Sequence, residues 1–171
     1  DRSHFALTGS AGFDLYADGR YVKTFRPGWN VEGHFESILP IPGERTMRQI
    51  TLEFPTYSGV KSLLVGLPEG ARLEAAAPYR HTLPVVYYGS SITQGGCVSR
   101  PGNTYQAILS RELDTDYVNL GFSGNAKGEA EMARYIASLP MSVFVMDYDH
   151  NAPNTEHLKA THEPFFRIIR E

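Results

Sequence analysis

Two patterns of hydrophobic and polar residues divide the chain, with a border near residues 76–84. Before the border, short alternating runs are separated by turn residues. The clearest pair is Phe13–Ala17 and Arg20–Phe25, and the Asp-Gly between them predicts a β-hairpin. Further strands are predicted at His34–Leu39, Arg48–Phe54, Val60–Leu67 and Arg72–Ala75. No helix is predicted here, and the strand spacing indicates a small all-β sandwich or jelly roll over residues 1–80.

After the border, apolar runs of strand length alternate with stretches of helical spacing. The predicted strands are Leu83–Tyr88, Tyr117–Gly121 and Ser142–Tyr148. The predicted helices begin near Asn103 or Thr104, at Glu129 and near Thr155. This order is typical of a parallel sheet with helical crossovers, so residues 84–171 are predicted to form an α/β domain. A sheet of three strands is thin, with two exposed edges, and we expect it to be part of a larger domain.

Composition excludes several classes of function. The net charge is −3 and no cluster of lysine and arginine occurs, which argues against nucleic-acid binding. The longest apolar runs are far shorter than the roughly 20 residues of a membrane span. Cys97 is the single cysteine and the six histidines lack ligand spacing, so neither a disulfide framework nor a metal site is predicted. No cofactor is predicted.

Candidate chemistry lies where the three predicted parallel strands end. Ser91 follows the first strand, a Gly-Phe-Ser-Gly-Asn run at 121–125 follows the second, and Asp149-His150-Asn151 follows the third. Carboxyl ends of parallel strands meet at one edge of a sheet. A nucleophilic serine needs donors for the oxygen of a tetrahedral intermediate, and backbone N–H groups with an asparagine amide can supply them. One serine, one glycine and one asparagine therefore predict a nucleophile with its oxyanion hole.

The same residues resemble the sequence blocks of the SGNH (GDSL-type) hydrolases. Gly89–Gly95 matches the first block, with Ser91 at the nucleophile position. Asn119–Gly124 resembles the second block, in which Gly124 would donate its N–H, and Asp147–Asn151 resembles the third, in which Asn151 would donate its amide. The resemblance implies a flavodoxin-like three-layer α/β/α domain, no cofactor, and a serine esterase acting on small, acetyl-like acyl esters of the kind found on carbohydrates.

The amino-terminal half adds to this resemblance. Gly12-Phe13-Asp14-Leu15-Tyr16 resembles the GxDLY-type β-rich module that precedes the hydrolase domain in a bacterial subgroup of the family. Ser90 stands where the family more often has aspartate. The family's fourth block, an Asp and a His near the carboxyl terminus, would be expected many tens of residues beyond Asn151. We therefore expect a fragment whose catalytic Asp and His lie outside this sequence.

Three histidines of this sequence are candidates for the general base. Asp147-Tyr148-Asp149-His150 has the Asp-x-x-His spacing, but it lies inside the third block, where positioning the loop is the favoured interpretation. His157 and His162 lie on the last predicted helix and are expected to face solvent. The sequence therefore predicts that the base of Ser91 is not among these residues.

Several alternatives stay open. Gly121–Gly128, with Lys127, precedes a helix and could hold a phosphate, although it lacks the residue order of a P-loop or a dinucleotide site. Cys97 could be a reactive thiol, although a small apolar role is favoured. Trp29 and nearby tyrosines could stack on sugars, although core packing is favoured.

Rival functions for the whole chain are acyl transfer to an alcohol through the same serine, and carbohydrate binding without catalysis. The expected partner is a small-molecule or glycan ester, with no nucleic acid and no membrane, and the oligomeric state is unassigned. The chain begins at Asp1 rather than Met, so a secreted or periplasmic location stays open.

Overall fold

The structure is a computed structural model that describes residues 4–31 and 33–171. The chain forms two compact units, each described here by itself. The first unit takes residues 1–78 and 97–104, and the second takes residues 79–96 and 105–171. The chain therefore passes from one unit to the other three times, and the stretch 97–104 belongs to the first unit although the second surrounds it in sequence. The predicted domain limits, 1–80 and 84–171, stay a prediction.

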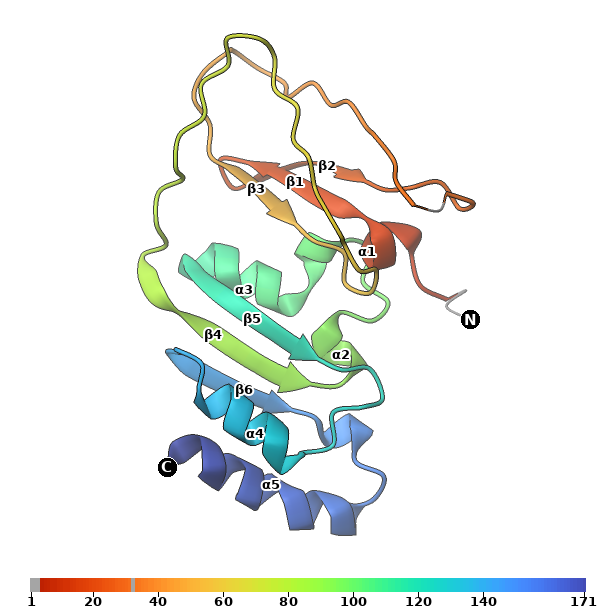
Figure 1. The fold of residues 1–171 in the computed structure, drawn as a ribbon, viewed down its shortest axis with the longest axis vertical. Helices are drawn as coiled ribbons and strands as arrows, with labels where there is room; N and C mark the ends of the chain where they lie inside the picture. The colour runs from red at the N-terminus through yellow and green to blue at the C-terminus, as the bar shows by residue number, and fades with distance from the viewer. Residues whose placement is uncertain (1–3, 32) are drawn as a thin grey trace. The chain divides into compact units, whose positions relative to one another are not determined.

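A parallel sheet forms the centre of the second unit. Its strands are β4 (His81–Gly89), β5 (Thr115–Gly121) and β6 (Val143–Asp147), and their order is β5-β4-β6. β4 pairs in parallel with both neighbours, so that Gly89 lies opposite Gly121 on one side and Asp147 on the other. All three strands run in the same direction in Figure 1. The predicted parallel α/β architecture is confirmed, and the three strands end at one edge.

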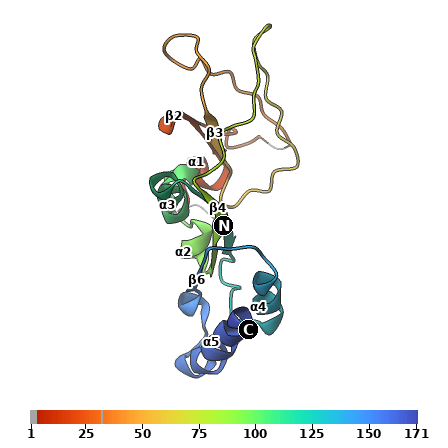
Figure 2. The same ribbon diagram turned by 90° about the vertical axis from the view of Figure 1, so that its left-hand side faces the viewer.

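Helices cover both faces of this sheet. Val86 and Tyr88 point to the face covered by α4 (Ala130–Ala137) and α5 (Thr155–Arg170), where Ile136 and Phe165 complete the buried core. On the other face, the Tyr87 ring packs edge-on against Tyr105 of α3 (Tyr105–Leu113), with 5.5 Å between ring centroids. Figure 2 shows α2 (Ser91–Gln94) and α3 on one side of the sheet and α4 on the other. This is the three-layer arrangement that the resemblance implies.

The first unit contains a small antiparallel sheet. Its strands are β1 (Phe13–Ala17), β2 (Arg20–Phe25) and β3 (Ile50–Glu53), in the order β2-β1-β3. β1 and β2 form the predicted hairpin, and the two turn residues Asp18 and Gly19 have φ of 51° and 73°, as a tight hairpin turn requires. The hairpin prediction is confirmed.

The remaining predictions for the first unit are corrected. A short helix, α1 (Leu7–Ala11), forms where none was predicted. No strand forms at 34–39, 60–67 or 72–75, and the strand predicted at 48–54 is limited to β3. The apolar residues of these stretches are largely in solvent, since Ile38, Leu64 and Leu73 are 96%, 92% and 84% exposed. An alternating run becomes a strand only where another strand pairs with it, so the expected sandwich or jelly roll is only partly shown.

Three short helical segments lie in the loops. They are α2 (Ser91–Gln94), η1 (Pro101–Asn103) and η2 (Asp149–Asn151). Of the helices that the structure describes, none combines the length and the apolar character that crossing a membrane would take.

Candidate active site

Ser91 is the first residue of α2, directly after the end of β4. The preceding residue, Ser90, is buried, and its hydroxyl caps the helix by accepting a hydrogen bond from the backbone N–H of Ile92 (3.2 Å). Its own N–H donates to the backbone oxygen of Asp147 (3.1 Å). Serine and aspartate are about equally good N-cap residues. Ser90 therefore retains the capping function at the position where the resembled family more often has aspartate.

Thr93, two residues after Ser91, is fully buried and fixes α2 to its surroundings. Its hydroxyl donates to Asp147 Oδ2 (3.1 Å) and accepts from the Tyr105 hydroxyl (3.2 Å). Its backbone oxygen accepts from Gln106 Nε2 (2.7 Å) and Asn119 Nδ2 (2.9 Å). The turn that carries Ser91 is thus bonded to β6, α3 and β5.

Sequence reasoning did not identify Thr93, Tyr105 and Gln106 as parts of the site. Their partners are 12 to 54 residues away in sequence, so no local pattern reveals them. Asn119 offered one signal, since it is a polar residue inside an apolar strand.

The loop after β5 carries Gly124 in a tight turn. The N–H of Asn125 donates to the oxygen of Phe122 (2.8 Å), and Gly124, third in this turn, has φ of +74°. A type II turn requires positive φ at its third residue, which explains glycine there. The loop is joined to the α2 turn, because Phe122 N–H donates to Gly89 O and Ser123 N–H donates to Gln94 Oε1, both at 2.8 Å.

Asn151 ends η2, the helical turn that follows β6. Its side-chain Nδ2 donates to the backbone oxygen of Phe122 (3.0 Å), which joins the third loop to the second. A carbonyl only accepts, so the amide must present its NH2 group to this side of the site. One amide hydrogen is used in this bond, and the second is left for another acceptor.

The structure brings the three predicted loops together through these hydrogen bonds. In the part of the chain that the structure describes, the hydroxyl and N–H of Ser91 and the N–H of Gly124 have no hydrogen-bond partner. These groups and the second Asn151 amide hydrogen are therefore available to a ligand at the three strand ends. The assignment of Ser91 as nucleophile and of Gly124 and Asn151 as donors remains a prediction, and the geometry of the loops is compatible with it.

The nearby Asp147 and His150 do not form a pair that could activate Ser91. The Asp147 carboxylate accepts from the hydroxyls of Thr93 (3.1 Å) and Tyr105 (3.5 Å), and His150 is exposed. Burial raises the pKa of Tyr105, and the negative charge of Asp147 raises it further, although the hydrogen bond to Thr93 lowers it. Tyr105 therefore stays protonated and Asp147 acts as a structural acceptor.

His157 does not face solvent as predicted. It is half-buried, and its Nε2 lies 2.8 Å from the backbone oxygen of Lys127. Because that oxygen can only accept, Nε2 carries a proton and is no base for Ser91. The His162 side chain is exposed and its ring stacks on Tyr148, with 6.2 Å between centroids.

A buried tyrosine supports the loop that follows Gly124. The Tyr88 hydroxyl donates to Glu129 Oε2 (2.7 Å) and accepts from Gly128 N–H (3.0 Å). Burial, with the neighbouring carboxylate, raises the pKa of Tyr88 well above its usual range. Burial alone would raise the pKa of Glu129, but the hydrogen bond from Tyr88, the backbone hydrogen bonds and the charge of Lys127 together lower it. The pair is a phenol and a carboxylate at neutral pH.

The side chains that the structure describes near the site give no support for a metal site or for a phosphate site at Gly121–Gly128. The described residues contain no group of three or more His, Cys, Asp or Glu side chains placed to hold a metal ion. Lys127 in the glycine-rich loop is exposed, and its backbone atoms are bonded to Glu129 and His157.

Comparisons with known proteins agree with the geometry. The profile of the GDSL-like lipase/acylhydrolase family matches residues 82–171. No curated protein matches the chain. Among solved structures, a protein from Bacteroides ovatus ATCC 8483 described as a candidate GDSL-like lipase is 28% identical, with a TM-score of 0.76 over 98% of this chain and 50% of that chain.

A second solved structure is similar in fold. The salicylyl-acyltransferase SsfX3 from a tetracycline biosynthetic pathway is 23% identical, with a TM-score of 0.69 over 94% of this chain and 48% of that chain. The present chain thus spans about half the length of each of these two solved structures.

Proposed function

Because the chain belongs to the GDSL-like lipase/acylhydrolase family, we propose that it carries the nucleophile and the oxyanion hole of a serine ester hydrolase. Ser91 is the proposed nucleophile. Its Oγ attacks the ester carbonyl carbon while its proton passes to a base, and the carbonyl oxygen becomes an oxyanion. Collapse of this intermediate breaks the bond to the alcohol, which leaves with that proton, and the acyl group stays on Ser91. Water then attacks the acyl group and releases the acid and the free serine.

The proposed oxyanion donors are the N–H groups of Ser91 and Gly124 and the side-chain amide of Asn151. The observation that carries this proposal is that, among the described residues, the Ser91 hydroxyl and N–H and the Gly124 N–H have no hydrogen-bond partner, while hydrogen bonds from Phe122, Ser123 and Asn151 join the loops that carry them. Donors that are already oriented need no rearrangement when the oxyanion forms, which is how such groups lower the barrier. The bond from Asn151 to Phe122 O keeps the amide in place.

The proton acceptor for Ser91 is proposed to lie outside the described residues. His157 has its Nε2 committed to Lys127 O, and no described histidine is hydrogen-bonded to Ser91. A serine without a base is a poor nucleophile. Residues 1–171 on their own are therefore expected to hydrolyse esters very slowly.

The proposed substrate is an ester with a small, acetyl-like acyl group, with a carbohydrate as a candidate alcohol. The similarity to an acyltransferase favours a second candidate, transfer of the acyl group from Ser91 to an alcohol instead of water. Product analysis with and without an added acceptor alcohol separates the two. Ester formation in place of free acid would indicate the transferase, and free acid alone would indicate the hydrolase.

The test of the nucleophile is Ser91→Ala in the full-length natural protein. Hydrolysis of a chromogenic acetyl ester should fall by at least roughly 10³-fold, because no acyl-enzyme can form. Ser123→Ala is the matched control, since Ser123 lies on the adjacent loop and contributes its N–H rather than its hydroxyl to the site. A Ser91→Ala protein that keeps the rate of Ser123→Ala would remove Ser91 from the mechanism.

A further inference from the structure

A buried carboxylate in the first unit has no place in the proposed chemistry. Asp14 lies on β1, in the middle of the Gly12–Tyr16 motif, and its side chain is completely buried. Its Oδ2 accepts from Arg100 Nη1 and from the backbone N–H of Gly102, both at 2.8 Å. Its Oδ1 accepts from the Thr24 hydroxyl. A buried charge is stable only when paired and hydrogen-bonded, and Asp14 obtains two of its three partners from the stretch 97–104.

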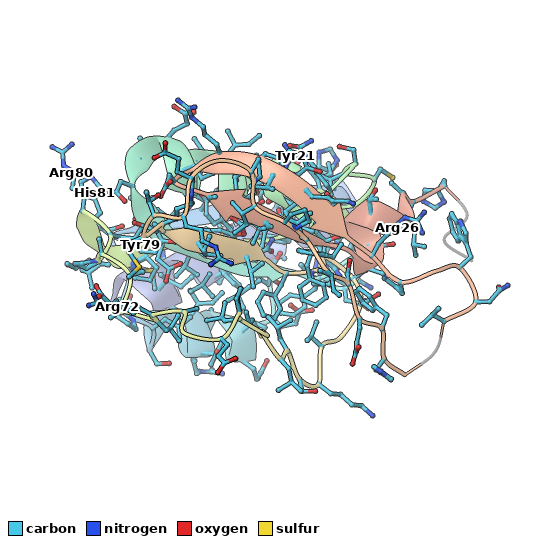
Figure 3. The ribbon with its side chains drawn as sticks, turned by 90° about the horizontal axis from the view of Figure 1, so that it is seen from above. Tyr21, Arg26, Arg72, Tyr79, Arg80 and His81 are labelled. Atoms are coloured by element: carbon cyan, nitrogen blue, oxygen red, sulfur yellow. The ribbon has the colours of Figure 1, made fainter. Side chains whose placement is uncertain are left out.

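Arg100 is held from two further directions. Its guanidinium lies 4.0 Å from the centroid of the Tyr21 ring, a favourable cation–π distance, and it also donates to the Tyr16 hydroxyl. Tyr21 lies on β2 (Figure 3). Burial lowers the pKa of Arg100, but its hydrogen bonds to Tyr16 and Asp14 outweigh burial and the pKa is raised.

The stretch 97–104 lies directly against β1 and α1. A Cβ atom added to Gly102 would be 2.1 Å from the Tyr16 hydroxyl oxygen, so the backbone approaches as closely as glycine permits. At the other end of the stretch, Thr8 Oγ1 donates to Ser99 O, and a Cβ on Gly9 would be 2.1 Å from Val98 O. The stretch is therefore fixed at several points along its length within the first unit.

The sequence neighbours of this stretch are parts of the candidate site. Residue 97 follows the α2 turn that begins with Ser91, and residue 104 precedes α3. The first two residues of α3, Tyr105 and Gln106, bond to Thr93 of that turn (3.2 and 2.7 Å). Fixing residues 97–104 therefore restrains, through the chain itself, both of the segments that hold the Ser91 turn.

We propose that Asp14 and Arg100 are positioning residues for Ser91: their ion pair holds residues 97–104 and so keeps the Ser91 turn in its reactive position. The structural part of this proposal, the coupling between Asp14 and the turn, stands on the contacts above. Its catalytic part rests on the proposed function. The proposal also assigns a function to the Gly12–Tyr16 motif, because Asp14 and Tyr16 accept the hydrogen bonds that Arg100 and Gly102 donate.

Hydrogen exchange read by mass spectrometry tests the coupling without any assay of activity. Asp14→Asn keeps the size of the side chain but removes its charge. Exchange should rise roughly tenfold or more in residues 97–104, as expected for losing hydrogen bonds to a charged group, and also in residues 91–96, while β6 stays protected. Asp18→Asn is the matched control, since Asp18 has an exposed ion pair with Arg48 (3.4 Å) in the same unit.

Two outcomes overturn the proposal. One is faster exchange confined to 97–104, with 91–96 as protected as in the Asp18→Asn protein. The other is faster exchange in both stretches with an unchanged kcat for ester hydrolysis in the full-length natural protein. If Asp14→Asn does not fold, Arg100→Lys replaces it, because the Arg100 side chain is partly exposed and lysine keeps the charge without the planar group over Tyr21.

The kinetic readout separates positioning from general damage. Asp14→Asn or Arg100→Lys should lower kcat by about 10- to 10²-fold with little change in KM, as expected when a reacting atom is displaced by about 1 Å. An inactive wild-type protein would count against the proposed function alone, because the exchange result decides the coupling independently.

Discussion

β4 and the stretch 60–67 look alike as sequences and differ completely as structures. Both contain a short run of apolar residues bounded by turn signals. In β4, Val86 and Tyr88 are fully buried, while in the other stretch Leu64 and Val65 are 92% and 64% exposed. β4 has a paired strand on each side and helices over both faces. This difference shows that a strand forms only where distant parts of the chain supply strands to pair with it and helices to cover it.

The same contrast separates the candidate site from the irregular part of the first unit. The strand ends of β4, β5 and β6 are joined by hydrogen bonds from Phe122, Ser123 and Asn151. These hydrogen bonds fix the three loops relative to one another. They do not use the N–H groups of Ser91 and Gly124, which remain available to a substrate. Mutations should therefore have large effects at the strand ends and small effects in the exposed stretches.

After Ser91→Ala, the largest loss of activity is expected from Asn151→Ala, a substitution within the candidate site itself. Asn151→Ala removes both the bond to Phe122 O and the proposed oxyanion donor. The turnover number for an acetyl ester should fall by roughly 10²–10³-fold. Steady-state kinetics of the full-length natural protein measure this, and Asn125→Ala serves as the control because Asn125 is an exposed amide on the adjacent loop. Equal rates for the two variants would make Asn151 purely structural.

The same substitution, Ile to Ala, can be made in both regions, and its effect on the free energy of unfolding compares them directly. Ile136 of α4 is completely buried and Ile38 of the first unit is 96% exposed. Ile136→Ala should lower the free energy of unfolding by about 2–5 kcal/mol, because it leaves a cavity. Ile38→Ala should change it by less than about 0.5 kcal/mol. Urea unfolding curves compare the two, and a large loss for Ile38→Ala would mean that its side chain is covered in solution.

The smallest effect concerns Glu129, which holds the loop after Gly124 through Tyr88. The pKa of Glu129 is lowered from 4.5 in the folded state, so its contribution to stability is present above that value. It is lost as pH falls through the folded-state pKa. Glu129→Gln should cost no more than about 1 kcal/mol at pH 7, since Glu129 is exposed and Tyr88 can still donate to the amide oxygen.

The pH dependence is the decisive part of this prediction. Thermal unfolding should show the difference between wild type and Glu129→Gln at neutral pH, and the difference should shrink as the pH falls below 4.5 and through the lowered pKa of Glu129. Glu131→Gln is the control, because Glu131 lies in the first turn of α4, whose N-cap is Glu129, and is 85% exposed. A difference that persists in acid would assign the effect to packing rather than to charge.

Much of the second unit could be predicted from the sequence, because its signals are local. Buried parallel strands read as continuous apolar runs, and the strands at 83–88, 117–121 and 142–148 are found as β4, β5 and β6 with small shifts at their ends. Ser91 and Asn151 are candidates because each lies in the loop that follows such a strand, and their roles stay predictions.

The remaining features of the fold and of the candidate site could not be predicted, because they depend on contacts between residues far apart in the chain. The ion pair of Asp14 and Arg100 spans 86 positions, and no local pattern announces it. His157 was placed wrongly for the same reason, because its acceptor, Lys127 O, is 30 residues away. The strands predicted at 34–39 and 60–67 do not form. Alternating apolar and polar residues indicate which side chains would share a face of a sheet, but not whether another strand is there to pair with.

The central claim is that Ser91 is a nucleophile at a preformed oxyanion hole. Its most direct test is treatment of the full-length natural protein with an organophosphonate, followed by peptide mapping in a mass spectrometer. One covalent adduct is expected, on Ser91; Ser91→Ala should abolish it and Asn151→Ala should slow its formation. Labelling that spares Ser91, or that proceeds equally well on Ser90 or Ser123, would contradict it.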